Sequence, residues 1–101
     1  MRRGRLPAAL LDRLADRFKA LGEPSRLAIL SALHAGELSV GELVARTGLG
    51  QANVSKHLDL LRRCGFVVRR KDGLNAYYRI ADHDVFRICD VLCEPLHRAA
   101  G

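Results

Sequence analysis

This chain of 101 residues has little of what several protein classes require. It contains no tryptophan, two tyrosines and three phenylalanines, so its core has to be built mainly from Leu, Val, Ile and Ala. Its three cysteines are an odd number and lack the spacing of a secreted disulfide framework. We therefore expect a cytoplasmic protein with reduced thiols. No stretch approaches the roughly 20 apolar residues that a membrane helix needs.

The motifs of common enzymes are also missing. The sequence has no Gly-rich phosphate loop, no clustered carboxylates and no Ser–His–Asp arrangement, so we do not expect an enzyme. It has no internal repeats, low-complexity tracts or linkers, and 101 residues are too few for two independent cores. The prediction is one domain that spans residues 1–101.

The most informative stretch begins at Ser39. Ser39 and Glu42 have the spacing of a capping box, which starts a short helix that the turn signal at 47–50 ends. A second helix follows, with an apolar stripe at i, i+4 and i+7 formed by Val54, Leu58 and Leu61. A short helix, a tight turn and a helix that opens with polar residues predict a helix-turn-helix over about 40–64.

After Gly65 the sequence pattern changes from helical to β. Two runs rich in β-formers, 66–68 and 76–80, flank the basic segment 69–75. This pattern predicts a hairpin with a basic tip. A helix-turn-helix followed by such a hairpin, at about 66–80, predicts a mainly α winged helix-turn-helix with a small β-hairpin wing.

Positive charge is concentrated in the same region. The chain has a net charge of +6, residues 51–80 carry +5, and residues 81–101 carry −2. This distribution is typical of binding to double-stranded DNA, although a merely basic, soluble surface is the alternative. The candidates for contacts with base edges are Gln51, Asn53, Ser55 and Lys56. The candidates for phosphate contacts are Arg62, Arg63, Arg69, Arg70, Lys71 and His57, and a local hydrogen bond is the alternative for His57.

The terminal helices, expected at about 6–21 and 82–96, are more apolar than a DNA-binding core with a wing requires. We therefore expect a two-fold homodimer, with Leu10, Leu14, Val85, Ile88, Leu92 and Leu96 in its interface. The alternative is that both helices fold back on their own core. A helix between them, over 25–35, should bury Leu27, Leu30 and Leu33. Two recognition helices roughly 34 Å apart would read an inverted-repeat operator.

The sequence resembles the ArsR/SmtB family of winged-helix transcriptional repressors. The resemblance covers about residues 14–80 and rests on LGEPSRLAIL, on SVGELVARTGLGQANVSKHLDLLRRCGFVVRRKDG and on YYRI. It implies a dimeric repressor whose DNA affinity falls when a metal ion, an arsenical or an oxidising or sulfur species binds. Ser39 and Gly41 occupy the positions of the family's two sensing cysteines, and Asp84, Pro95 and Arg98 those of its zinc ligands. We expect both family sites to be absent.

Cys89 and Cys93 are the remaining candidates for an effector site, because residues at i and i+4 share one helix face. Their thiolates suit arsenite or a soft metal ion, with Cys64, a partner's cysteine or His97 as a third ligand. Pro95 weighs against His97, since proline removes a helical hydrogen bond. Reversible oxidation of the pair and simple packing in a dimer seam are the alternatives. A protein-interaction winged helix is the competing function, and the operator, the target genes and repression as against activation stay open.

Overall fold

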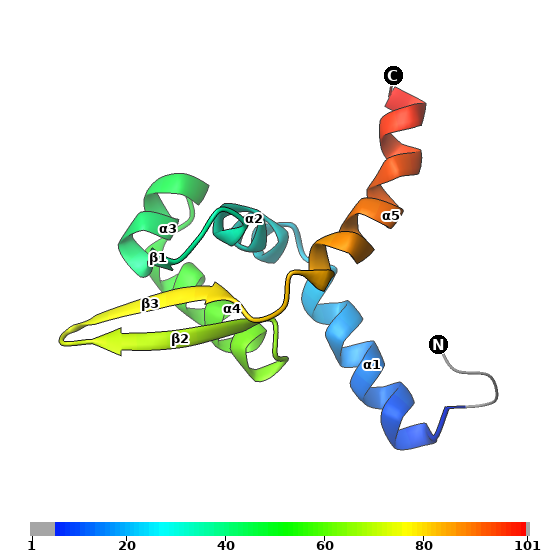
Figure 1. Ribbon diagram of the computed structural model, residues 1–101, viewed down its shortest axis with the longest axis horizontal. Helices are drawn as coiled ribbons and strands as arrows, with labels where there is room; N and C mark the ends of the chain where they lie inside the picture. Colours follow the sequence, from blue (N-terminus) through cyan, green and yellow to red (C-terminus); the bar gives the residue numbers. More distant parts are fainter. Residues whose placement is uncertain (1–5, 101) are drawn as a thin grey trace.

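The computed structural model describes residues 6–100. Within them the chain forms five helices and three strands, arranged as shown in Figure 1. In chain order these are α1 (Ala8–Leu21), α2 (Pro24–Leu33), β1 (Leu38–Ser39), α3 (Val40–Thr47), α4 (Gln51–Arg63), β2 (Val67–Asp72), β3 (Asn75–Ile80) and α5 (Asp84–Ala100). The predicted winged helix-turn-helix is confirmed, with α3 and α4 as its two helices and β2 and β3 as the wing. The single-domain prediction also includes residues 1–5 and 101, which lie outside the described residues.

Local hydrogen bonds fix where α2 and α3 begin. The Glu23 carboxylate accepts a hydrogen bond from the backbone N–H of Arg26 at 3.1 Å, which caps α2. At α3 the predicted capping box forms: Ser39 Oγ accepts from the Glu42 N–H at 3.2 Å, and Glu42 Oε1 accepts from the Ser39 N–H at 3.0 Å. Gly48 ends α3 with φ 74°, a left-handed conformation that favours glycine. The turn into α4 is therefore encoded locally.

The sheet has three antiparallel strands in the order β1-β3-β2. The hairpin between β2 and β3 turns at Gly73, with φ 62°, followed by the fully exposed Leu74. Glycine at the first central position is typical of a type II′ hairpin turn, which matches the twist of the flanking strands. The third strand, β1, is not predicted by the sequence, because two residues show no alternation of apolar and polar side chains.

The core lies between α2, α3, α4 and the base of the sheet. The predicted stripe of α4 is confirmed, since Val54, Leu58 and Leu61 are each 0% exposed. The prediction for α2 is partly wrong: Leu27 is 39% exposed, and Ile29 is buried together with Leu30 and Leu33. Leu27 instead borders a groove that residues of α1 and α5 also line.

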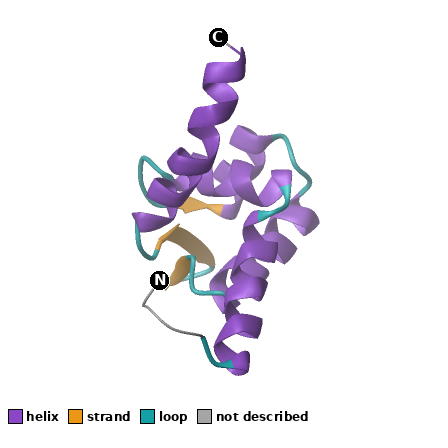
Figure 2. Ribbon diagram, turned by 90° about the vertical axis from the view of Figure 1, so that its right-hand side faces the viewer, coloured by secondary structure: helices purple, strands orange, loops and turns teal. Residues whose placement is uncertain are grey.

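The helices α1 and α5 project from the side of the domain opposite the wing (Figure 1), and α5 rises away from the rest of the chain in the view of Figure 2. Both expose large apolar side chains: Leu10, Leu11 and Phe18 on α1, and Ile88, Val91, Leu92 and Leu96 on α5. Within residues 6–100, no helix is both long and apolar enough to cross a membrane.

Two predictions about α5 need correction. Val85, expected in a dimer interface, is only 5% exposed and belongs to the core of its own chain, where it anchors the start of the helix. The predicted end of the helix at about residue 96 is also wrong, since α5 runs through Pro95 to Ala100. Proline removes one backbone hydrogen bond but leaves the other bonds of the helix in place. As a result His97 remains one turn beyond Cys93 on a continuous helix.

Candidate nucleic-acid interface

The first turns of α4 present polar side chains to solvent. Gln51, Asn53, Ser55 and Lys56 are all exposed to solvent, whereas Val54, Leu58 and Leu61 of the same helix are buried. Gly50 caps the helix without a side-chain hydrogen bond, so the first backbone N–H groups of α4 are left to solvent or a ligand. This arrangement meets the geometric requirement for a helix that enters a major groove.

His57 differs from these neighbours, because its side chain turns back toward α2. Its Nδ1 lies 3.3 Å from Arg26 Nη1, and its Nε2 lies 3.8 Å from a Glu23 carboxylate oxygen. The side chain is only 18% exposed. The local hydrogen bond considered for His57 is therefore the contact that the structure contains, and His57 orients α4 against α2.

Arg26 extends the same network to α1. Its Nε donates to the backbone oxygen of Ala20 at 2.7 Å, and its Nη2 donates to that of Lys19 at 3.1 Å. Arg17 makes a second link: its Nη1 donates to the Cys64 carbonyl at 2.6 Å, and its guanidinium lies 4.5 Å from the centroid of the Phe66 ring. Arg26 thus links α1 to the middle of α4, Arg17 links α1 to the C-terminal end of α4, and sequence analysis missed both arginines.

The strand register places the basic residues Arg69, Arg70 and Lys71 on two different faces of the wing. Side chains of cross-strand partners share a face, so Arg69 lies on the face of Tyr78, while Arg70 lies with Tyr77 on the other face. Tyr78 is buried in the core together with residues of α4, whereas Tyr77 is only half-buried. Lys71, two residues beyond Arg69, shares its face. Arg69 and Lys71 therefore point to the α4 side of the wing, and Arg70 points away from it.

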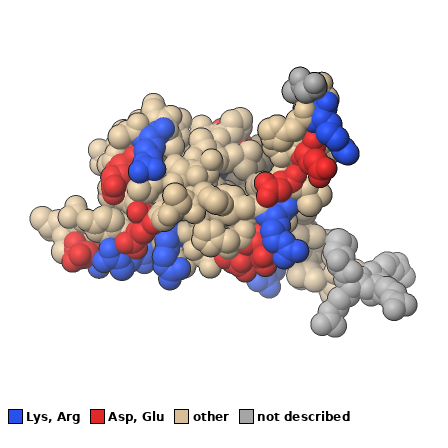
Figure 3. Space-filling view, turned by 45° about the horizontal axis from the view of Figure 1, so that its top comes forward, with Lys and Arg blue, Asp and Glu red and all other residues tan. Residues whose placement is uncertain are grey.

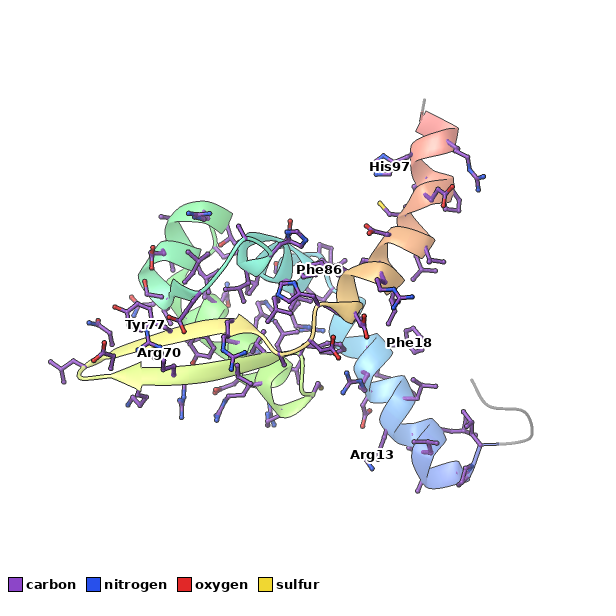
Figure 4. The ribbon with its side chains drawn as sticks, in the orientation of Figure 1. Arg13, Phe18, Arg70, Tyr77, Phe86 and His97 are labelled. Carbon is purple, nitrogen blue, oxygen red and sulfur yellow. The ribbon has the colours of Figure 1, made fainter. Side chains whose placement is uncertain are left out.

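Arg70 is held by partners within the chain. Its Nη2 and Nε donate to the two carboxylate oxygens of Glu37 at 2.7 Å and 3.1 Å, and its guanidinium lies 4.8 Å from the centroid of the Tyr77 ring. The hydrogen bond from Arg70 lowers the pKa of Glu37 below its usual 4.5. This bidentate pair ties the wing to the segment before β1, so Arg70 positions the wing. Figure 4 shows Arg70 and Tyr77 next to each other on the wing.

The other basic residues remain accessible. Arg62 Nη2 lies 3.6 Å from a carboxylate oxygen of Asp59, but both side chains are largely exposed. Such surface pairs contribute about 0–1 kcal/mol, so Arg62 is available to a phosphate. Arg63 is also exposed. On the face that Figure 3 shows, Lys and Arg are interspersed with Asp and Glu along the wing.

The second group of candidate residues lies on α5. Cys89 and Cys93 line one apolar groove of about 480 Å³ between α1, α2 and α5, with walls that include Phe18, Leu27 and Leu92. Cys93 Sγ lies 3.4 Å from His97 Nε2. Burial raises the pKa of Cys89, and the nearby Asp90 carboxylate raises it further, which favours the neutral thiol.

Cys64 is not part of that group. It borders a different, smaller hollow with Arg13, Asp16, Arg17 and Arg63. In the described part of the chain, no three His, Cys, Asp or Glu side chains lie close enough together to hold one metal ion. Within one protomer the structure thus brings together two pairs, Cys89 with Cys93 along the groove and Cys93 with His97, and leaves Cys64 apart.

An exposed polar helix beside a β-wing defines a winged helix-turn-helix domain. Residues 23–68 match the sequence model described as "Bacterial regulatory protein, arsR family". The solution structure of the homodimeric winged helix-turn-helix DNA-binding domain of Mb0332 from Mycobacterium bovis is 35% identical, with a TM-score of 0.81, over 98% of this chain and 94% of that one. The chain belongs to the ArsR family of bacterial regulatory proteins, as the sequence predicts.

Two of the relatives that the chain resembles in sequence are named as transcriptional regulators. The HTH-type transcriptional regulator Rv0324 of Mycobacterium tuberculosis is 42% identical over 81 residues, and the probable mercury resistance operon repressor of Streptomyces lividans is 38% identical over 77 residues. These matches cover 80% and 76% of this chain, but only 36% and 62% of the respective relatives. The chain thus spans less than two thirds of the length of either relative.

Proposed function

We propose that this chain is a homodimeric, sequence-specific DNA-binding repressor of transcription that reads an inverted repeat. The observation that carries the proposal is the position of Arg69 and Lys71 on the α4 face of the wing. The helix α4 would place Gln51 and Asn53 against base edges, while the wing binds the adjacent phosphates. Membership of a family of regulatory proteins supports this function over an enzymatic one.

The apolar surfaces of α1 and α5 support a dimer. Leu92 and Leu96 are 65% and 68% exposed, and Phe18 is 52% exposed. Contiguous apolar surface of this kind favours association with a partner, and the related Mb0332 domain is described as homodimeric. A two-fold axis would place two copies of α4 roughly 34 Å apart, which matches two half-sites of a repeat.

The effector of this repressor would act at Cys89 and Cys93. Both thiols line the groove beside the exposed apolar face of α5, so a bound metal or metalloid ion would change the packing of the proposed dimer seam. One relative is named a probable mercury resistance operon repressor, which supports a thiol-reactive metal ion as the effector over other kinds of effector. The effector would release DNA by favouring a dimer geometry that does not fit the operator.

The first experiment is fluorescence anisotropy with labelled DNA from upstream of the gene. The reduced protein should bind an inverted repeat in that DNA more tightly than a scrambled repeat of the same composition, and its affinity should fall steeply with salt. Asn53→Ala should cost about 1–3 kcal/mol on the repeat and much less on scrambled DNA. Arg87→Ala, which removes an exposed charge from α5, is the matched control and should leave the preference unchanged.

The dimer is tested separately by sedimentation equilibrium. Leu92→Glu should convert the dimer to a monomer and weaken operator binding, because it places a charge in the proposed seam. Asp90→Ala, on the same helix, should remain dimeric. A protein that binds repeat and scrambled DNA equally well would instead be a non-specific DNA-binding protein, and one that binds neither would favour the protein-interaction function.

A further inference from the structure

One exposed apolar side chain lies far from the proposed dimer seam. Among the described residues, the other large exposed apolar side chains belong to α1, α2 or α5, whereas Leu74 lies in the turn between β2 and β3. It is fully exposed, at the tip of the wing that extends away from α1 and α5 (Figure 1). Isolated leucines are common on protein surfaces, so it is the position of Leu74, beyond the basic residues Arg69 and Lys71, that calls for an explanation.

The hairpin turn itself does not require a leucine. Gly73 supplies the left-handed φ of 62°, and the position after glycine in a type II′ turn accepts most residues. The acidic residue of the tip lies on the face turned away from α4, where an Asp72 carboxylate oxygen is 3.7 Å from Arg70 Nη1. The end of the wing therefore presents to a ligand on the α4 side two basic side chains, followed by an apolar one.

The length of the wing matches the distance from one groove of DNA to the next. With α4 in a major groove, the adjacent minor groove lies half a helical turn away, roughly 17 Å along the DNA axis. The strand β2 (Val67–Asp72) spans about 20 Å at about 3.3 Å per residue. Arg69 and Lys71 would then contact the phosphates between the two grooves. Leu74, which lies beyond them, would reach the minor groove.

A leucine side chain in the minor groove would distinguish between base pairs. The groove is about 6 Å wide, and A·T and T·A pairs present only acceptors there, whereas a G·C pair adds the N2 amino group of guanine. That amino group occupies the floor of the groove, and a leucine packed against it would leave its N–H donors without a partner. Apolar side chains, leucine among them, are used in this way by proteins that bind the minor groove.

We propose that Leu74 enters the minor groove outside each half-site and selects A·T over G·C base pairs there. This inference rests on the proposed function, since it adds a specificity-determining residue to the same DNA interface. The wing extends away from α1 and α5, the helices of the proposed dimer seam (Figure 1). The two Leu74 contacts of a dimer would therefore lie at the outer ends of the operator, about 5 base pairs beyond the bases that α4 reads.

The test uses the full chain and four duplexes that share one inverted repeat and differ only in these outer base pairs. The outer pairs are A·T, G·C, inosine·C or 2,6-diaminopurine·T. Inosine·C has the minor groove of A·T and the major groove of G·C, and diaminopurine·T has the reverse combination. The wild type should bind the A·T and inosine·C duplexes about tenfold more tightly than the other two. A preference for A·T and diaminopurine·T would indicate reading from the major groove and would overturn the proposal.

Variants at the tip assign the preference to one side chain. Leu74→Ala should lose about tenfold in affinity on the A·T and inosine·C duplexes and nothing on the other two, whereas Leu74→Met should keep the preference. Because Leu74 is fully exposed, both variants should melt like the wild type, and neither should change the salt dependence of binding. Asn53→Ala, the matched control, should lose the same factor on all four duplexes. A Leu74→Ala variant with the wild-type preference would overturn the proposal.

Scrambled duplexes, with each type of base pair placed throughout, let the two proposals fail separately. If the wild type prefers the inverted repeat but binds all four outer pairs equally, the role of Leu74 is wrong and the repressor function stands. If it has no preference for the repeat but still favours A·T and inosine·C through Leu74, sequence-specific repression is wrong and the minor-groove contact stands. If it binds none of the duplexes, both proposals are wrong.

Discussion

Replacing Arg69 and Arg70 by alanine, one at a time, isolates the effect of the strand register on DNA binding. The two residues are adjacent, lie on the same strand and carry the same charge, so long-range electrostatics change equally in both variants. Only Arg69 lies on the α4 face of the wing, because its cross-strand partner is Tyr78. Arg70 lies on the opposite face and donates two hydrogen bonds to Glu37.

The expected difference can be calculated from counterion release. Each phosphate contact contributes about −0.9 to the slope of log K against log salt concentration. A dimer carries two copies of Arg69, so Arg69→Ala should make the slope less steep by about 1.8. Between 50 mM and 200 mM salt, the affinity gap between wild type and Arg69→Ala should then narrow about 12-fold. Arg70→Ala should leave the slope unchanged.

The assay is fluorescence anisotropy on one operator DNA at four or more salt concentrations within this range. Lys71→Ala serves as a second test, since it shares the face of Arg69 and should have the same effect on the slope. Thermal melting tests the role of Arg70 in holding the wing. Arg70→Ala should lower the melting temperature because the wing loses its hydrogen bonds to Glu37, whereas Arg69→Ala should not lower it. Equal slopes for Arg69→Ala and Arg70→Ala would refute the reasoning from register.

Three further predictions concern the stability of the fold. The hydrogen bonds from the Ser39 backbone and hydroxyl lower the pKa of Glu42 below its usual 4.5, so the stability that Glu42 contributes is complete above about pH 4.5 and falls as the pH drops through the lowered value. Thermal melts between pH 7 and pH 3 should show this loss in the wild type and a smaller loss in Glu42→Gln. Leu58→Ala should lower the free energy of unfolding in urea by about 2–5 kcal/mol, since Leu58 is 0% exposed. Gly48→Ala should cost about 1–2 kcal/mol in the same assay because of its φ of 74°, although no atom blocks a Cβ there.

Much of the fold follows from short-range patterns in the sequence. The capping box at Ser39 and Glu42, the left-handed turn at Gly48 and the apolar stripe of α4 each depend on residues within one or two turns of one another. Such patterns can be read without tertiary information, because the period of a helix and the chemistry of its caps are local properties. The resemblance to one family of regulators likewise came from contiguous motifs, and the comparisons bear it out.

The candidate site is less visible in the sequence, because its decisive contacts join distant residues. Arg26 meets His57 across 31 positions, Glu37 meets Arg70 across 33, and Arg17 meets Cys64 across 47. No short-range pattern in the sequence indicates that these arginines contact residues so far away along the chain. The contacts with DNA at Gln51, Asn53, Ser55 and Lys56 remain predictions.

By itself, the sequence determined the winged helix-turn-helix, the basic character of its DNA-motif region and the pair of thiols one turn apart on the last helix. Only the tertiary structure decided which face each side chain occupies. In the folded chain, Arg70 binds Glu37 and positions the wing, and His57 contacts Arg26 and Glu23 and so anchors α4. Val85 is buried in the core of its own chain, and Cys64 lies apart from the groove that Cys89 and Cys93 line. The physical reason is that helix and strand periods fix only relative directions within one element. The direction that faces the core or a partner is set when the elements pack.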